Sequence, residues 1–151
     1  RLLFIMETLT FDSGLVTYNI NDKAQVTFNP TDSSFAERLY SAFDALEKKQ
    51  DAYKAEIKEK TGTREVFTIA RKMDTEMREI IDSVFEKKLC DELFGDMNVY
   101  ALASGLPVWA NLLLAVIDKT NASMDEESKK TDDRLNKYLK KYGKHIDSAK
   151  R

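Results

Sequence analysis

Residues 112–117 form the longest unbroken apolar run of the chain, and they constrain its fold most because all six side chains favour removal from water. A break at Ser104-Gly105 precedes the run, and Pro107 then suits the first turn of a helix, where its missing N–H needs no partner. Leu114 and Ala115 flank an apolar stripe at helical spacing, which consists of Trp109, Leu112, Leu113, Val116 and Ile117. A helix that is apolar nearly all round is expected at the centre of a core or at an assembly surface.

Composition and charge exclude several classes of protein. A chain of 151 residues is expected to form one domain, and 42% hydrophobic with 33% charged residues is typical of an ordered protein with a highly charged exterior. A net charge of −2 gives no support for nucleic-acid binding, which favours a basic face. The single cysteine, Cys90, rules out an internal disulfide framework and fits a reducing cytosol. The apolar run is far too short to span a bilayer, so no membrane association is expected.

The first five residues hold one cation and four apolar side chains, which is too short for the apolar region of a secretory signal. Two alternatives stay open for this segment. Either residues 1–5 are native, or Met6 is the natural initiator and residues 1–5 derive from an upstream sequence.

Residues 7–29 have the composition of β-strands separated by turns. Three stretches alternate or are rich in β-branched and aromatic side chains, at residues 8–11, 15–20 and 24–28. Val16, Tyr18 and Ile20 share one consistently apolar face, so we expect one face to be buried and the other exposed. The pattern predicts an antiparallel β-hairpin or a three-stranded meander within residues 1–30.

Residues 31–118 are predicted to form a helical body that belongs to the same domain. Ser34 with Glu37 three residues later matches a capping box at the start of a helix. A narrow apolar stripe, interrupted at Gln50, predicts that this first helix runs to about residue 60.

A wider apolar stripe that includes Met77 predicts a second, more deeply buried helix, with Arg78 among the charged residues of its exposed side. Residues 88–94 continue it or form a short extra helix that ends at Gly95. A short turn of helix is expected at residues 98–103, before the apolar helix.

Residues 119–151 form a charged and polar C-terminal tail. One short amphipathic patch lies at Leu135, Tyr138, Leu139 and Tyr142. The tail either extends the apolar helix or folds only on a partner, because alone it has too little apolar area to order itself. The whole pattern predicts an α+β protein, mainly α-helical, in which an N-terminal hairpin or meander precedes a body of three or four helices.

Side chains suited to chemistry are isolated from one another. His145 is the only histidine and has no second His or Cys beside it, so we expect neither metal ligation nor base catalysis from it. Cys90 has lysines nearby but no base, which favours a core cysteine. Cations interleave with the acidic residues Glu76, Glu79, Asp82 and Glu86, which favours a solvated face laced with ion pairs. We therefore expect no catalytic residue, no metal and no cofactor.

Two apolar features fit either a core or a contact with a partner protein. Met73 and Met77 lie one turn apart, and methionine adapts to varied partners. Trp109 beside Pro107 is either a core anchor or an interface hot spot. The apolar helix also offers more surface than two helices and a hairpin need. The candidate partner-binding residues are Trp109, Leu112, Leu113, Val116 and Met77.

Several short stretches resemble one known family. They are Asp74-Thr75-Glu76-Met77-Arg78, Ile81-Asp82, Phe85, Cys90-Asp91, Phe94-Gly95, Gly105-Leu106-Pro107-Val108-Trp109-Ala110-Asn111-Leu112-Leu113 and the junction Asn29-Pro30-Thr31-Asp32-Ser33-Ser34-Phe35. These scattered identities, within residues 7–120, resemble the tail assembly chaperones of long-tailed phages and prophages of Gram-positive bacteria, which are encoded ahead of the tape measure protein.

The resemblance implies a viral protein of the host cytoplasm without enzyme activity. It implies a homo-oligomer that binds the tape measure protein and keeps it soluble while tail tube proteins polymerise around it. A longer product made by ribosomal frameshifting is also common in the family, and the lysine pairs of this sequence do not decide whether one exists here.

Three alternatives stay open. A structural virion component, such as a head–tail connector or minor tail protein, would use the β-element to pair with neighbours. A small enzyme or nucleic-acid regulator is a second alternative, although this sequence lacks the paired His or Cys residues, or the basic face, that such activities favour. A host-directed role against a bacterial defence leaves no mark in a sequence of this kind.

Overall fold

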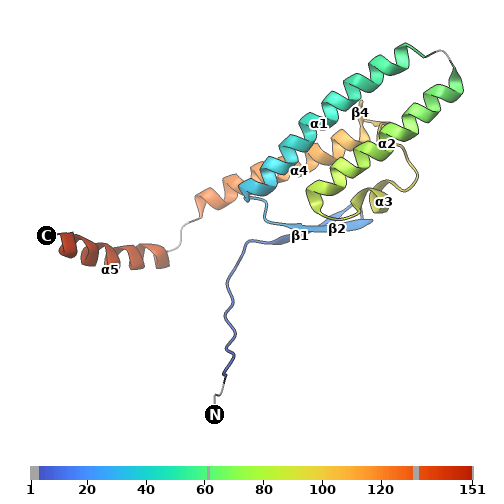
Figure 1. Cartoon of the computed structure of the whole chain (residues 1–151). Helices are drawn as coiled ribbons and strands as arrows, with labels where there is room; N and C mark the ends of the chain where they lie inside the picture. Colours follow the sequence, from blue (N-terminus) through green and yellow to red (C-terminus); the bar gives the residue numbers. More distant parts are fainter. Residues whose placement is uncertain (1–3, 61, 131–132, 151) are drawn as a thin grey trace.

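The computed structural model describes residues 4–60, 62–130 and 133–150, with side chains described up to residue 141. Residues 1–3 of the segment whose origin is open therefore lie outside the described residues. A β-hairpin is followed by a helical body and a last separate helix (Figure 1), which confirms the α+β, mainly helical fold. The elements in order are β1 (Val16–Ile20), β2 (Ala24–Phe28), α1 (Ser33–Lys58), α2 (Thr63–Phe85), α3 (Leu89–Phe94), β3 (Leu102–Ala103), β4 (Leu106–Pro107), α4 (Val108–Lys129) and α5 (Asp133–Lys150).

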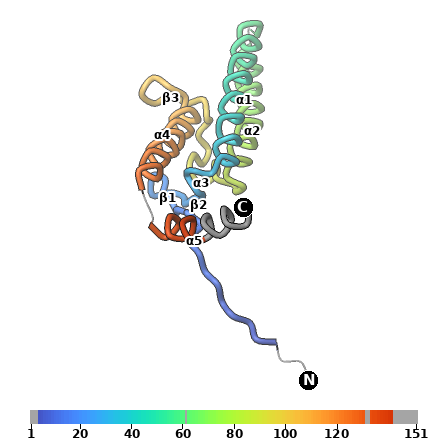
Figure 2. Tube along the Cα trace, turned by 90° about the vertical axis from the view of Figure 1, so that its left-hand side faces the viewer, coloured from blue at the N-terminus to red at the C-terminus, as the bar shows by residue number. Residues whose placement is uncertain are grey.

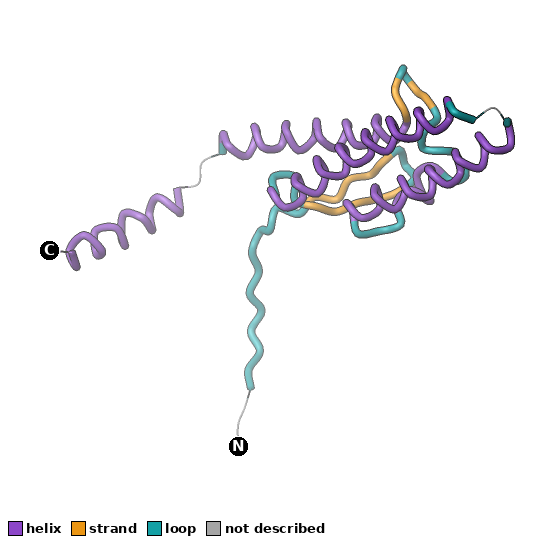
Figure 3. Tube along the Cα trace, turned by 45° about the horizontal axis from the view of Figure 1, so that its top comes forward, coloured by secondary structure: helices purple, strands orange, loops and turns teal. Residues whose placement is uncertain are grey.

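Two long antiparallel helices, α1 and α2, form the frame of the body. They have 26 and 23 residues and run side by side in every view (Figures 1 and 3). α4 packs against α1, and the β1–β2 hairpin closes the end of the body at which α1 begins and α2 ends. In Figure 2, β1 lies beside α4, whereas β2 lies toward α3, which it contacts.

The hairpin buries one face, as its alternation predicts. β1 and β2 pair from Val16 opposite Phe28 to Ile20 opposite Ala24. The turn places Asn21 and Asp22 at positive φ, which short polar side chains tolerate better than most others. The face toward the body comprises the buried side chains Ala24, Val26 and Phe28 and the half-buried side chains Tyr18 and Ile20.

Residues 4–13 form an extended segment, here called the N-terminal arm, that projects alone from the body (Figures 1 and 3). The third strand considered for residues 8–11 does not form, and the two-stranded alternative is confirmed. One reason is local: Asn29 Nδ2 donates to the carbonyl oxygen of Ser13 at 2.9 Å, so the base of the arm is held beside the β2–α1 junction.

Two local expectations are wrong. The N-cap of α1 is Asp32 rather than Ser34, because the Asp32 carboxylate accepts the backbone N–H of Ser34 at 2.9 Å. Residues 98–103 form no helix. Instead, β3 and β4 form a small hairpin whose turn residues, Ser104 and Gly105, both have positive φ.

The segment before this small hairpin supplies hydrogen-bond acceptors to the first residues of α4. Pro107, expected in the first turn of this helix, is instead its N-cap, so α4 begins one residue later, at Val108. The first two N–H groups of a helix have no partner within it, but here Val108 donates to the carbonyl of Ala101 at 2.8 Å and Trp109 to that of Val99 at 3.2 Å. The position of α4 therefore depends on the position of this loop.

Stacked aromatic rings join the hairpin to the frame. The rings of Phe28 and Phe35 are 4.1 Å apart and nearly parallel, and Tyr18 stacks on Phe28 at 4.8 Å. Phe85 at the end of α2 lies 6.0 Å from Phe35. This cluster links β1, β2, α1 and α2 at one end of the core, and aromatic pairs of this kind each contribute about 0.5–1.5 kcal/mol beyond their burial.

Trp109 joins α4 to α1 at the other end of the core. Its ring meets that of Phe43 edge-on at 5.4 Å, and its Nε1–H donates to Oε1 of Gln50 at 3.0 Å. Gln50 interrupts the apolar stripe of α1 because it satisfies the one polar group of a tryptophan that is 2% exposed. Trp109 is thus a core anchor.

We predict that Trp109→Ala lowers the free energy of unfolding by about 3–5 kcal/mol, as for other buried aromatic side chains. Gln50→Met should cost about 1–3 kcal/mol because it leaves the indole N–H without an acceptor. In a Trp109→Phe background the same Gln50→Met change should cost much less, since no N–H remains. Urea denaturation of the four proteins of this cycle measures the coupling, and additive effects would contradict it.

Candidate functional site

The five residues expected to bind a partner lie in the core. Met77 is 0% exposed and Trp109 2%, and the other three, Leu112, Leu113 and Val116, are also buried. The surplus of apolar surface expected on α4 is not present, because the narrow stripe of α1 requires α4 to cover it. Met77, Trp109 and Leu113 thus form part of the core, while Leu112 and Val116, each 8% exposed, also line the groove described below. The assignment of the five residues to partner binding stays a prediction.

Several of the residues that carry the family resemblance, namely Asp74, Arg78, Asp82, Cys90 and Asp91, meet in a polar network on α2. Arg78, expected on the exposed side, is only 14% exposed and binds four acceptors. Its Nε lies 3.0 Å from Asp74 Oδ2 and its Nη1 3.1 Å from Asp91 Oδ1. Its Nη2 donates at 2.7 Å to the carbonyl oxygens of Gly95 and Met97. One side chain therefore holds α2, α3 and the following loop together.

Two aspartates of the same helix complete this network. Asp74 Oδ1 accepts the backbone N–H of Val99 at 2.8 Å, and Asp82 Oδ1 accepts that of Cys90, near the start of α3, at 2.9 Å. Asp82 was expected on a solvated acidic face, but it is half-buried and satisfies a backbone donor of α3. The motif of the resemblance is therefore a fold-forming motif in this chain.

Cys90 is buried within this network. Its Sγ donates to the carbonyl oxygen of Arg78 at 3.8 Å. Burial, and after it the carboxylate of Asp82, raise the pKa of the Cys90 thiol far above its usual range. A thiol that remains protonated is a poor nucleophile, so Cys90 acts as a core side chain.

We predict that Arg78→Met lowers the free energy of unfolding by about 3–5 kcal/mol, because it leaves a partly buried carboxylate and two carbonyls without their donor. Arg78→Lys should cost less, since it keeps the charge but loses the planar fork. Arg71→Met, a change to an exposed arginine of the same helix, is the matched control and should stay within about 0.5 kcal/mol of wild type. Equal effects of Arg71→Met and Arg78→Met in urea denaturation would disprove the role of the network.

We also predict that native Cys90 resists iodoacetamide at pH 8.5. A raised pKa keeps the thiolate fraction low until the pH approaches that pKa, and burial blocks access. Labelling in the folded protein should be at least about 100-fold slower than in the same protein unfolded in urea. Mass spectrometry of timed samples gives both rates, and similar rates would show that the thiol is accessible.

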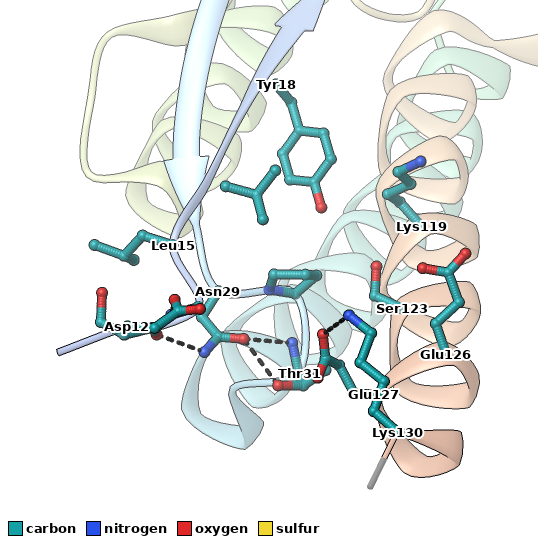
Figure 4. A pocket seen from close by; sticks show the side chains of 14 residues that line it. Asp12, Leu15, Tyr18, Asn29, Thr31, Lys119, Ser123, Glu126, Glu127 and Lys130 are labelled. Carbon is teal, nitrogen blue, oxygen red and sulfur yellow. Dashed lines mark hydrogen bonds and ion pairs between the residues drawn. The ribbon is translucent and has the colours of Figure 1, made fainter. Parts of the chain in front are cut away.

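A groove runs between β1 and α4, and we call it the β1–α4 groove; Figure 4 shows its polar part. Its apolar part has a volume of about 260 Å³ and is lined by Tyr18, Ile20, Val26, Phe28, Leu112, Ala115, Val116 and neighbouring residues. Its polar part, about 710 Å³, extends from the base of the arm to Lys130. Lys119 and Tyr18 border both parts, with the Lys119 ammonium 5.9 Å from the Tyr18 ring centre. No sequence pattern indicates this groove, because it depends on how the hairpin packs beside α4.

Exposed apolar side chains lie on the two segments that extend from the body. In the arm, Leu9 is 85% exposed and Phe11 80%. In α5, Leu135 is 64% exposed and Leu139 60%, with Tyr138 beside them. The amphipathic patch of the tail is thus placed on a helix, whereas residues 119–129 continue α4 (Figure 1). The side chains of Tyr142 and His145 lie outside the described residues.

Three kinds of comparison bear on identity. Comparison with protein-family models, with curated protein sequences and with solved structures finds no match to this chain. Within the described residues, no helix combines the length and apolar character that a membrane crossing requires. Over the same residues, no group of three His, Cys, Asp or Glu side chains is placed to hold a metal ion. The resemblance to tail assembly chaperones stays a prediction.

Proposed function

We propose that this chain is a non-catalytic tail assembly chaperone of a phage or prophage. It self-associates and binds the tape measure protein in the host cytoplasm, and it keeps that protein soluble while tail tube proteins assemble around it. The resemblance supplies the partner, and the contacts of Asp74, Arg78, Asp82 and Cys90 support it, because the resembling residues build the fold and do not form a reactive site.

The exposed apolar stripe of α5 is the observation that carries the proposal. Leu135 and Leu139 lie one turn apart on a helix that extends from the body (Figure 3). Such a stripe is complemented by the apolar face of another helix. Lys137 and Lys140 on the same helix are exposed and favour acidic residues on that partner. A helical segment of the tape measure protein with an apolar seam and acidic flanks has this chemistry.

The buried residues that the sequence suggested for partner binding have a structural role in this proposal. Trp109, Leu112 and Leu113 hold α4 against the frame, and α4 leads toward α5. A rigid α4 therefore carries the exposed helix away from the body, where a long partner is accessible.

We predict that co-expression of this chain keeps an otherwise insoluble tape measure fragment in the supernatant and that the two co-elute in size-exclusion chromatography. Leu135→Gln with Leu139→Gln keeps good helix formers but removes the stripe. Loss of two leucines that the complex would bury should weaken it at least about 100-fold. Asp133→Glu with Asn136→Gln, two exposed positions on the same helix, is the matched control and should behave as wild type.

Two results would contradict the proposal. One is an insoluble fragment with no co-eluting complex when the wild-type chain is present. The other is the chain at stoichiometric amounts in purified virions by mass spectrometry, since a chaperone leaves the finished particle and a structural component stays. The second result would favour the head–tail connector or minor tail protein alternative.

A further inference from the structure

β1 has an edge that no other strand covers. In the described part of the chain the sheet contains only β1 and β2, so each strand leaves one row of backbone N–H and C=O groups without a strand partner. Apart from the turn bond from Lys23 N–H to the carbonyl of Ile20, no backbone hydrogen bond among the described residues joins β1 to an element other than β2. This edge borders the β1–α4 groove, the polar part of which is seen in Figure 4.

The outer edge of β2, in contrast, is already covered. α3 lies against β2, and Lys87 Nζ donates to the carbonyl oxygen of Gln25 at 2.8 Å. Lys87 also pairs with Glu92 of α3 at 3.3 Å, which keeps its ammonium at this edge. An added strand therefore has access to β1 and not to β2.

The N-terminal arm has the pattern of a strand that lacks a partner. Leu9 and Phe11 alternate with Thr8 and Thr10, and Glu7 shares the face of Leu9 and Phe11. Residues 7–11 match the five residues of β1 in length. The arm thus presents an apolar row, ended by one carboxylate, to a surface outside its own body.

The groove complements that row. Leu112 and Val116 form its floor, with the exposed Ala115 beside them. Lys119 is the one charged residue among the described residues that line the apolar part. An arm with Leu9 and Phe11 on this floor therefore offers its carboxylate to an ammonium at the rim.

The base of the arm directs it away from its own groove. Gly14 has a φ of +71°, which disfavours most side chains, and a Cβ built there would lie 2.6 Å from Asn29 Nδ2, so a larger residue would displace the Asn29 amide. Gly14 N–H donates to Asp12 Oδ1 at 2.9 Å, and the bond from Asn29 to Ser13 holds the turn in place. From this turn the arm runs away from β1, and all three overall views show it projecting outward (Figures 1 to 3).

We propose that residues 7–11 of one copy add as a strand to the β1 edge of a second copy, with Leu9 and Phe11 seated in the β1–α4 groove and Glu7 paired with Lys119. This inference specifies the self-association contained in the proposed function. Backbone hydrogen bonds to β1 supply the register-independent part of the contact, and the two apolar side chains fix the register.

Sedimentation velocity over a range of concentrations tests the arm. The wild-type chain should self-associate, and Leu9→Ser with Phe11→Ser should raise the dissociation constant at least about 100-fold, because two large apolar side chains stay in water. Thr8→Ser with Thr10→Ser alters the other face of the same arm and should leave association unchanged. All these residues are exposed in the single chain, so the thermal unfolding of the dilute monomer should not change.

Variants on the groove test the receiving surface. Ala115→Glu places a carboxylate on the floor from an exposed position, and it should weaken association as strongly as the arm variant. Glu7→Lys should weaken it as well, and Lys119→Glu in the same chain should restore it, since the pair is then reversed.

Cross-linking between differently tagged copies distinguishes arm exchange between two copies from an arm that folds back onto the groove of its own chain. Thr8→Cys is placed in one copy and Thr17→Cys in the other, because Thr8 follows the Glu7 that pairs with Lys119 beside Tyr18 and both positions face the solvent side of the proposed sheet. A short bismaleimide should join the two tags, while native Cys90 is buried and does not compete. Cross-links found only within a chain that carries both cysteines would show that the arm covers its own groove, and they would overturn the proposal.

The remaining outcomes keep the two proposals distinguishable. A wild-type chain that is monomeric at every concentration overturns this inference and the self-association in the proposed function. An oligomer that is insensitive to the arm and groove variants overturns the arm exchange alone. Failure to bind the tape measure fragment, with arm-dependent association intact, overturns the chaperone function and leaves this inference standing.

Discussion

The positions of α3, of the loop after it and of the start of α4 depend on the guanidinium of Arg78. It binds Asp74 on its own helix, Asp91 on α3 and two carbonyls of the following loop, while it is largely withdrawn from water. That loop then presents the carbonyls of Val99 and Ala101 to the first N–H groups of α4. Asp74 and Arg78 on α2 therefore help to set where the apolar helix α4 begins, at Val108. Removal of the arginine would affect α3, the loop and α4 together, since each relies on the one before it.

The core needs nearly all of the apolar surface of α4, and this decides where a partner can bind. α1 is long and its apolar stripe is narrow, so it needs cover from both α2 and α4. Trp109, Leu112, Leu113 and Val116 provide that cover and are buried. Exposed apolar side chains lie on the N-terminal arm and on α5, and also on the body, at Phe67 of α2 and Leu102 of β3. The proposed contacts therefore use the two projecting segments together with the β1–α4 groove of the body.

Periodicity predicted the elements well because it reports which face each element buries. The hairpin, the two long helices and the apolar helix all follow from alternation or from 3–4 spacing. Contacts distant in sequence were less visible. Gln50 interrupts the apolar stripe in the sequence, and only the fold places it beside Trp109. Arg78 was predicted to be exposed because its acceptors lie up to nineteen residues away in the sequence. The helix expected at residues 98–103 is replaced by a tight turn that needs positive φ at Ser104 and Gly105. The β1–α4 groove has no local signal, since it lies between elements that are far apart in sequence.

The proposed arm exchange and the proposed binding through α5 are linked by simple energetics. A single helix that presents two leucines and a tyrosine can bury only a modest apolar area, and the translational and rotational freedom lost on binding offsets much of that gain. An arm-to-groove contact joins two different surfaces, so repetition around an axis gives a closed ring and reciprocal exchange gives a dimer. In either assembly several copies of α5 are held near one another. A long partner with repeated apolar segments would then bind them at high effective concentration, and weak single contacts would combine into a stable complex. Self-association is therefore the condition under which so small an exposed stripe can hold a long helical protein.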